Sequence, residues 1–283
     1  MSTTAGPPSR IAETFARLRR ENRAALIPYL MAGDPDLETT RRLVLSMARH
    51  GGDIIELGVP FSDPLADGPT IQAASQRALA RGTTLTRVFA LVRRLRRETQ
   101  VPLVLMTYYN LIFRMGEEGF VRRAVAAGVD GVIVPDLPPE EAQGLLAPAR
   151  RHGLDTVFLA APTSTPQRLQ KVAEASTGFV YYVSLTGVTG SRLTVDEALR
   201  RGVQRLRAMT DKPVAVGFGV STPEQAARIA RWADGVIVGS AIVRRIGEVC
   251  EKGRGLREVA AFVAALRRAM PRRAGTAKPP GAI

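Results

Sequence analysis

The stretch KPVAVGFGVSTPEQAARIARWADGVIVGS (212–240) contains one strand–helix–strand unit, and the rest of the chain repeats its pattern. Both ends of the stretch are short apolar runs, whereas PEQAARIARWAD between them has its apolar residues at helical spacing. No hairpin turn separates the two runs. We therefore expect two parallel strands joined by a helical crossover.

The same unit recurs along the chain, because apolar runs alternate with amphipathic stretches throughout. The eight runs are ALIPYL (25–30), DIIELGV (53–59), PLVLM (102–106), GVIVPD (131–136), DTVFLA (155–160), FVYYVS (179–184), KPVAVGFG (212–219) and GVIVGS (235–240). Eight parallel strands with crossover helices in about 250 residues predict an α/β fold, a single (β/α)8 TIM barrel. We expect a flexible N-terminus over 1–9, the barrel with a short preceding helix over 10–270, and a disordered basic tail over 271–283.

The composition is that of a globular protein with a basic surface. Of the 283 residues, 45% are hydrophobic and 23% charged, and 40 Lys+Arg against 26 Asp+Glu give a net charge of +14. The arginines fall on expected outer helix faces, and an aromatic content of 5% leaves too few rings for base-stacking platforms. We therefore expect no nucleic-acid binding. Because no apolar run is long enough to span a membrane and no secretory signal is visible, we expect a cytoplasmic protein.

The residue types that usually hold metals are scarce in this sequence. The single cysteine, Cys250, excludes an intrachain disulfide and a cysteine-based metal cluster. The two histidines, His50 and His152, each stand directly before a glycine at the expected end of a helix. We therefore interpret both histidines as helix-end residues and expect no metal site.

Glu56 breaks the apolar pattern of its strand. In DIIELGV (53–59), a period of two places Ile54, Glu56 and Gly58 on one face of the strand. The other face carries Ile55, Leu57 and Val59. Glu56 then points into the barrel near the carboxyl end of the strand, where barrel active sites lie. An interior salt bridge would be the alternative, but the facing strand segments carry no Lys or Arg at that depth. We predict that Glu56 is catalytic.

The loop after this strand adds a second acid, and the end of the chain adds a candidate anion site. Asp67 either faces the site or caps the helix expected to begin at Pro69. Gly219 follows the seventh strand, and Gly239 and Ser240 follow the eighth and open a helix. Backbone N–H groups at such positions bind phosphate in many barrels. We predict a phosphorylated ligand.

These residues also carry a family resemblance. The run ELGVPFSDPLADGPTIQ (56–72) resembles the signature of the tryptophan synthase alpha chain family. Further segments resemble the same family in the same order: YLMAGDP (29–35), YYN (108–110), PDLP (135–138), SLTGVTG (184–190), GFGV (217–220) and GSAIV (239–243). The resemblance spans about residues 10–268.

The resemblance implies a lyase that cleaves indole-3-glycerol phosphate to indole and D-glyceraldehyde 3-phosphate in a retro-aldol reaction. The chain itself would need no cofactor. It would pair, in an α2β2 heterotetramer, with a beta chain that uses pyridoxal phosphate to join the indole to serine.

The resemblance also implies roles for single residues. Glu56 would shuttle protons, Asp67 would accept a hydrogen bond from the indole N–H, and either Tyr181 or its neighbour Tyr182 would face the site, Tyr181 being the one that matches the family. Tyr29 and Phe218 would sandwich the indole. The phosphate would be held by Gly190, Gly219, Gly239 and Ser240. We also expect Thr189 to bond Asp67 when the loop after the sixth strand closes, and we expect the beta chain to contact the loop after the second strand together with Tyr109 and Asn110.

Two other interpretations remain open at this stage, namely another phosphate-binding barrel of the same type and a protein that binds a ligand or nucleic acid without catalysis. A stand-alone indole-glycerol phosphate lyase would release indole without a partner, and an aminoaldose isomerase would not need the 56–72 run. A non-catalytic binding protein or a nucleic-acid binder would not need both Glu56 and Asp67.

Overall fold

The computed structural model describes residues 8–183, 192–217, 219–251 and 256–271. Its strands are β1 (Ala25–Met31), β2 (Ile55–Gly58), β3 (Leu103–Met106), β4 (Gly131–Ile133), β5 (Asp155–Val157), β6 (Leu159–Ala160), β7 (Val180–Val183), β8 (Val214–Gly217) and β9 (Gly235–Val238). Its helices are α1 (Arg10–Arg20), α2 (Leu37–Arg49), α3 (Pro69–Ala80), α4 (Leu85–Leu95), α5 (Tyr109–Met115), α6 (Glu117–Ala127), α7 (Gln143–His152), α8 (Pro166–Ala175), α9 (Arg192–Met209), α10 (Pro223–Ala230), α11 (Ser240–Glu251) and α12 (Arg257–Ala269).

The strands form one parallel barrel in the order β5-β4-β3-β2-β1-β9-β8-β7-β6. The expected strand over 155–160 is split at Phe158 into β5, which pairs with β4, and β6, which pairs with β7. At the split, the Phe158 carbonyl still accepts from the Tyr181 N–H at 3.1 Å, so this one segment closes the ring. The predicted (β/α)8 barrel is therefore confirmed. It has nine strands instead of eight because β5 and β6 together occupy the place of one predicted strand.

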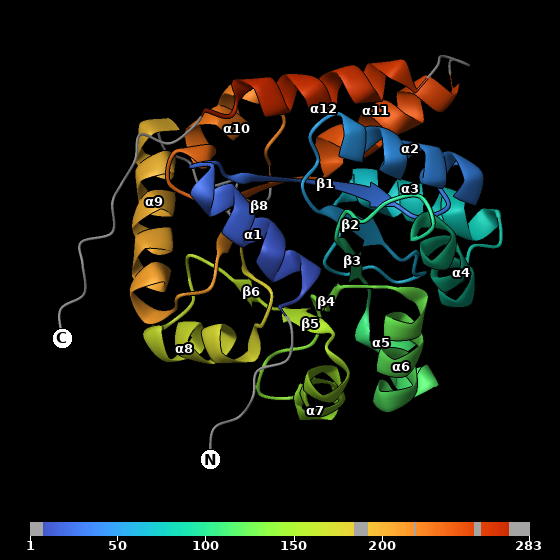
Figure 1. The fold of residues 1–283 in the computed structure, drawn as a ribbon, viewed down its shortest axis with the longest axis horizontal. Helices are drawn as coiled ribbons and strands as arrows, with labels where there is room; N and C mark the ends of the chain where they lie inside the picture. Colours follow the sequence, from blue (N-terminus) through green and yellow to red (C-terminus); the bar gives the residue numbers. More distant parts are fainter. Residues whose placement is uncertain (1–7, 184–191, 218, 252–255, 272–283) are drawn as a thin grey trace.

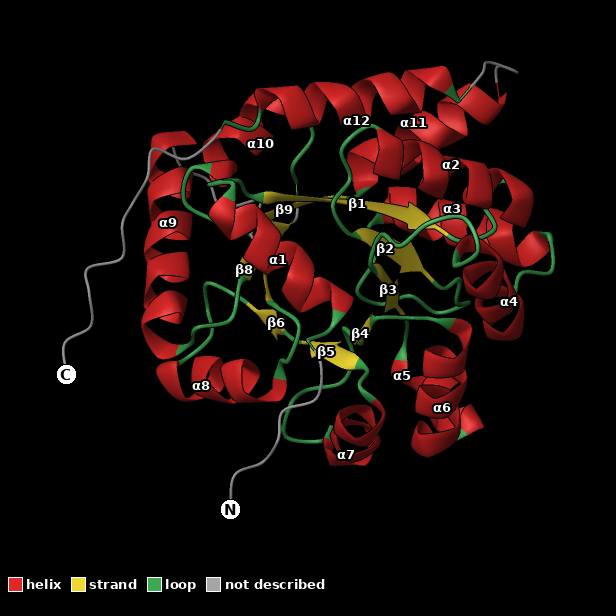
Figure 2. Ribbon diagram, viewed as in Figure 1, coloured by secondary structure: helices red, strands yellow, loops and turns green. Residues whose placement is uncertain are grey.

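Helices surround the ring of strands (Figure 2), and the strands separate two apolar layers. Alternate strand residues such as Ile27, Val104 and Ala215 point inward and form a small central cluster. Their neighbours, such as Ile55 and Leu57, point outward into a much larger cluster beneath the helices. This alternation agrees with the two faces predicted for β2. Both faces are buried, as is usual for a parallel strand in a barrel.

Helix α1 covers the amino-terminal opening of the barrel and lies across its centre in Figure 1. Ile11, Phe15 and Leu18 on its inner face belong to the same cluster as the interior strand residues. The Phe15 and Phe179 rings lie 5.8 Å apart between their centroids. Since α1 covers this end of the barrel, a ligand can reach the interior only from the carboxyl ends of the strands.

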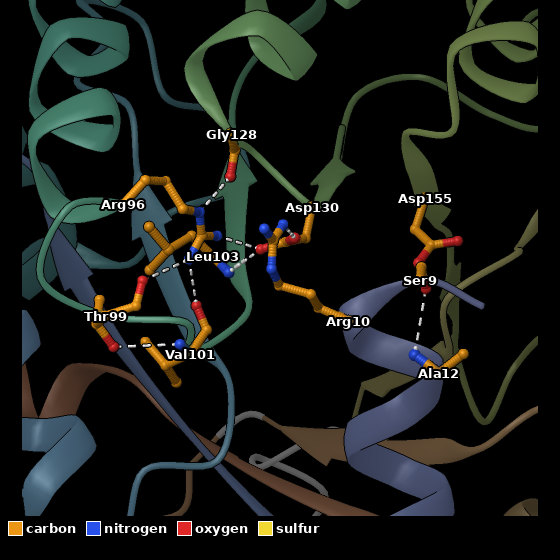
Figure 3. Close-up of polar contacts among 10 residues, drawn as sticks. All are labelled: Ser9, Arg10, Ala12, Arg96, Thr99, Val101, Leu103, Gly128, Asp130 and Asp155. Atoms are coloured by element: carbon orange, nitrogen blue, oxygen red, sulfur yellow. Dashed lines mark hydrogen bonds and ion pairs between the residues drawn. The ribbon is translucent and has the colours of Figure 1, made fainter. Parts of the chain in front are cut away.

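An ion-pair cluster fixes α1 at this end (Figure 3). The Asp130 carboxylate accepts from Arg10 Nη1 at 2.9 Å, from the Leu103 N–H at 2.7 Å and from Arg96. The Asp130 side chain is 4% exposed. A charge buried to that extent requires these partners, so the cluster has a structural role on the face opposite the carboxyl ends of the strands.

Several local predictions are confirmed by the helix ends. His50 is the C-cap of α2, and His152 is the last residue of α7, whose C-cap Gly153 is left-handed. Helix α3 begins with Pro69 behind Gly68 as N-cap, which means that Asp67 does not cap it. Across the described part of the chain, no helix is both long and apolar enough to cross a membrane.

Candidate active site

A cavity of about 170 Å³ opens at the carboxyl ends of the strands. Of the ten residues predicted from the sequence, seven line it: Tyr29, Glu56, Asp67, Tyr181, Gly219, Gly239 and Ser240. The remaining three, Thr189, Gly190 and Phe218, lie outside the described residues. The structure therefore brings residues from β1, β2, β7 and the loops after β2, β8 and β9 to one place.

Glu56 is the most buried polar group of the cavity, with 1% of its surface exposed. Strand β2 holds it between Tyr29 of β1 and Val104 of β3, its register partners. Among the described residues, its Oε2 atom has no hydrogen-bond partner. Burial, and then the negative charge of Asp67, raise the pKa of Glu56 to about 8. The side chain is therefore mainly protonated at neutral pH and can donate a proton.

Asp67 lies half-buried in the loop between β2 and α3. Burial raises the pKa of its carboxyl group to about 6, and a hydrogen bond with the Tyr108 hydroxyl acts in the opposite direction. Its main chain is fixed on both sides, because its N–H donates to the Pro64 carbonyl at 3.0 Å and its carbonyl accepts from Gln72 Nε2 at 2.8 Å. Asp67 is therefore mainly ionised at neutral pH, whereas Glu56 is mainly protonated. The cavity thus contains one carboxylic acid that can donate a proton and one carboxylate.

Tyr108 is a site residue to which sequence reasoning gave no role. It is 4% exposed, its ring stacks on Phe61 at 5.2 Å, and its hydroxyl accepts from the Ala66 N–H at 3.0 Å. Because that oxygen accepts from the main chain, its own proton is available to Asp67. The period of two along β3 could have indicated Tyr108. Val104 of β3 faces the interior and Met106 lines the cavity, so the next alternate residue, Tyr108, is expected to face inward as well.

Two buried tyrosines form the wall of the cavity beside Glu56. Tyr29 and Tyr181 are 5% and 8% exposed, and burial raises the pKa of both phenols. Gly58 and Gly217 make room for them, because a Cβ at either glycine would overlap the phenol of Tyr29 or Tyr181 respectively. Both rings therefore stay neutral and close to the buried carboxyl group.

The choice between Tyr181 and Tyr182, which the sequence left open, is decided by the strand. Tyr181 lines the cavity, whereas Tyr182 lies in the outer cluster beneath the helices. The Tyr182 phenol occupies the space next to Gly202 of α9, where a Cβ would overlap its hydroxyl. The tyrosine that the resemblance indicated is thus the one that faces the site.

The other end of the cavity is built from the loops after β8 and β9. Gly219 has a φ of +74°, in the left-handed region that favours glycine. The Gly239 carbonyl accepts from the N–H groups of Ile242 and Val243 at 2.8 and 3.1 Å, which starts α11. The N–H groups of the first helical residues have no intrahelical acceptor, so this end of the cavity can bind an anion. Arg244, also on α11, lines the cavity, and sequence reasoning had not singled it out.

In the described ranges, no group of three or more His, Cys, Asp or Glu side chains is placed to hold a metal ion.

Comparison with known proteins extends over the whole barrel. The sequence profile of the tryptophan synthase alpha chain family matches residues 15–271. The tryptophan synthase alpha chain of Geobacter sulfurreducens is 56% identical over 262 residues, which cover 93% of this chain and 99% of that protein. The alpha chain of Geotalea uraniireducens is 54% identical over 260 residues, which cover 92% of this chain and 97% of the relative.

Solved structures agree with the sequence relatives. Tryptophan synthase subunit alpha from Legionella pneumophila superposes with a TM-score of 0.87 at 38% identity, covering 93% of this chain and 99% of the other. A tryptophan synthase chain from M. tuberculosis superposes with a TM-score of 0.84 at 42% identity, covering 94% of this chain and 100% of the other. The chain whose barrel and cavity are described above therefore belongs to the tryptophan synthase alpha chain family.

Proposed function

We propose that Glu56 and Asp67 together carry the reaction of the tryptophan synthase alpha chain, the cleavage of indole-3-glycerol phosphate to indole and D-glyceraldehyde 3-phosphate. The bond between indole C3 and the glycerol side chain breaks. C3 gains a proton, and the neighbouring hydroxyl of the side chain loses one and becomes the aldehyde. Because one proton is gained and one is lost, a single acid–base group can serve both steps.

Glu56 is the group that moves these protons. Its pKa of about 8 keeps it protonated at neutral pH, and its Oε2 atom, which has no hydrogen-bond partner among the described residues, can bond a substrate in the cavity. It donates to C3, becomes a carboxylate, and then accepts the proton of the hydroxyl. This unpartnered buried carboxyl group is the observation that carries the proposal.

Asp67 stabilises the charge that appears on the ring. When C3 is protonated, positive charge develops on the indole nitrogen, and an ionised carboxylate accepting from the N–H stabilises it. Tyr29 supplies one apolar face for the indole, and Tyr181 closes the wall next to Glu56. In this mechanism the two acids have separate roles, Glu56 as the proton carrier and Asp67 as a fixed negative charge.

The phosphate binds at Gly219, Gly239 and Ser240, at the end of the cavity built from the loops after β8 and β9. Main-chain N–H groups and the start of α11 favour a dianion there. No cofactor takes part in this half of the reaction, because pyridoxal phosphate belongs to the beta chain.

The alpha chain pairs with a beta chain, and we place the contact on the loop after β2 and on α5 in an α2β2 heterotetramer. Leu65 is 94% exposed and Phe113 is 67% exposed, both unusual for large apolar side chains. The loop is kept in shape by its own turn, in which the Leu65 N–H donates to the Asp63 carbonyl at 3.0 Å. Tyr109 next to Phe113 is fixed through its N–H, which donates to the Asp136 carboxylate at 2.9 Å. We also propose that the protein works in the cytoplasm.

The test is an indole-release assay on indole-3-glycerol phosphate with and without a beta chain. Glu56→Gln keeps the shape of the side chain but cannot transfer protons, so we expect less than a hundredth of the wild-type rate. Glu174→Gln, an exposed side chain on α8, is the matched control and should be fully active. A Glu56→Gln variant with a tenth or more of the wild-type rate would overturn the assignment, and strong indole release without any beta chain would favour a stand-alone lyase.

A further inference from the structure

Arg244 is the one cationic side chain among the described residues that line the cavity. It belongs to α11, four residues after Ser240, and therefore lies on the same helix face, one turn further along. Side chains on a helix lean toward its amino-terminal end. A long side chain at this position consequently points back toward Gly239 and Ser240, at the mouth of the cavity.

No structural role accounts for this charge. Within the described residues, Arg244 is exposed and forms no hydrogen bond or ion pair, in contrast to its neighbour Arg245. The Arg245 guanidinium lies 3.6 Å from the centroid of the Phe262 ring and donates to the Ala241 carbonyl at 2.9 Å. One arginine of this pair thus supports the packing of α11 on α12, while the other remains available for a ligand.

The charge also lies away from the two acids of the site. The pKa values of Glu56 and Asp67 are both raised, and no cation is among the causes that act on either group. A guanidinium close to these carboxyl groups would lower both pKa values. Arg244 therefore leaves the proton carrier protonated and acts at the opposite end of the cavity, where the main-chain donors lie.

We propose that Arg244 is a specificity-determining residue that binds the phosphate dianion of the substrate from the solvent side, opposite the main-chain donors of Gly239 and Ser240. The inference rests on the proposed function, because it uses the same phosphate site. A charge-assisted contact to a dianion strengthens binding of every phosphorylated ligand. It does not strengthen binding of indole, which carries no charge.

The test compares Arg244→Met with Arg244→Lys. We expect Arg244→Met to raise the KM for indole-3-glycerol phosphate roughly 10-fold, with kcat within about 2-fold of wild type, because the contact exists before and during the reaction. The Kd for sn-glycerol 3-phosphate should rise by a similar factor, and the Kd for indole should not change. Arg244→Lys keeps the charge and should recover most of the affinity.

The matched control is Arg42→Met, which removes one positive charge from an exposed site on α2 away from the cavity. It separates a local contact from the general field of a basic protein. Salt should weaken the binding of glycerol 3-phosphate more steeply in wild type and in Arg42→Met than in Arg244→Met.

The outcomes distinguish the two proposals. An unchanged Kd for glycerol 3-phosphate in Arg244→Met, or an equal rise in Arg42→Met, would overturn the role of Arg244 and leave the proposed function intact. A wild-type protein that neither binds glycerol 3-phosphate nor releases indole would overturn the proposed function itself. Thermal unfolding of each variant shows whether an affinity change reflects damage to the fold.

Discussion

Glu56 and Asp67 line the same cavity, and the negative charge of Asp67 adds to burial in raising the pKa of Glu56 to about 8. The pKa of the half-buried Asp67 rises only to about 6, because burial raises it and a hydrogen bond with the Tyr108 hydroxyl acts in the opposite direction. Two carboxyl groups in one cavity therefore have different charges at neutral pH.

The first prediction concerns the pH dependence of kcat/KM for indole-3-glycerol phosphate. The proposed mechanism requires Asp67 ionised and Glu56 protonated, so the rate should rise as pH increases through about 6 and fall as it increases through about 8. Steady-state kinetics from pH 5 to 9.5 measure both limbs, with a stability check at each pH. A profile that stays level well above pH 8 would contradict Glu56 as the proton donor.

The second prediction concerns stability, which the same buried carboxyl group should make pH-dependent. The pKa of Glu56 is raised on folding from 4.5 to about 8, so wild type is fully stable with respect to this group below pH 4.5 and loses stability as pH rises to about 8. Glu56→Gln has no proton to lose. Its stability relative to wild type should therefore increase over this range, by at most about 3 kcal/mol at pH 7.

Urea unfolding of both proteins at pH 5 and pH 8 measures this change. Glu174→Gln, with its exposed side chain, serves as the control and should follow wild type at both pH values. A stability difference between Glu56→Gln and wild type that does not vary with pH would show that Glu56 is ionised in the folded protein.

The third prediction separates Tyr108 from its neighbour Tyr109. The hydrogen bond from Tyr108 lowers the pKa of Asp67, so Tyr108→Phe should move the acid limb of the kcat/KM profile to higher pH. Activity at pH 6 should then fall several-fold more than activity at pH 8. Tyr109→Phe removes a bond of 2.7 Å to Glu117 outside the cavity, and its acid limb should remain in place. Equal losses at both pH values in Tyr108→Phe would indicate a purely structural role.

The fourth prediction tests the fit between Gly58 and Tyr29. A methyl group at Gly58 would overlap the Tyr29 phenol and push it toward the substrate position. Gly58→Ala should therefore lower kcat/KM by roughly 100-fold, because small displacements of positioning groups are costly. It should also destabilise the protein by about 1–3 kcal/mol. Gly119→Ala is the control, since its new Cβ would meet only Met115 at 3.9 Å. Wild-type kinetics in Gly58→Ala would show that the position of Tyr29 is not critical.

The fifth prediction addresses the surface for the beta chain. Leu65→Lys places a charge on a side chain that is 94% exposed, so folding and the rate of the isolated alpha chain should not change. Affinity for the beta chain should fall roughly 10-fold or more, because burying the new charge in an interface is unfavourable. Leu65→Met keeps the surface apolar and should bind normally. Calorimetric titration with the beta chain distinguishes the two, and equal affinities would exclude this loop from the contact.

The sequence by itself determined the features that depend on local periodicity. Alternation of apolar runs with amphipathic stretches predicts parallel strands with helical crossovers, and a period of two in β2 predicts that Glu56 faces inward. The ends of α2 and α7 were also legible, because glycine after the last helical residue is a local signal. Each of these inferences needs only residues that are close together along the chain.

The tertiary structure decided the features that depend on distant segments. The split of 155–160 into β5 and β6 follows from closing the ring between β4 and β7, and the inward choice of Tyr181 over Tyr182 follows from pairing with β6 and β8. Local periodicity predicts that Tyr108 faces inward, but the bond between its hydroxyl and the Ala66 N–H joins residues 42 positions apart and is made only by the packed chain. The pKa difference between Glu56 and Asp67 is likewise set by how deeply the closed barrel buries each group. Burial and contact across the barrel are properties of the packed chain, and no local pattern of residues encodes them.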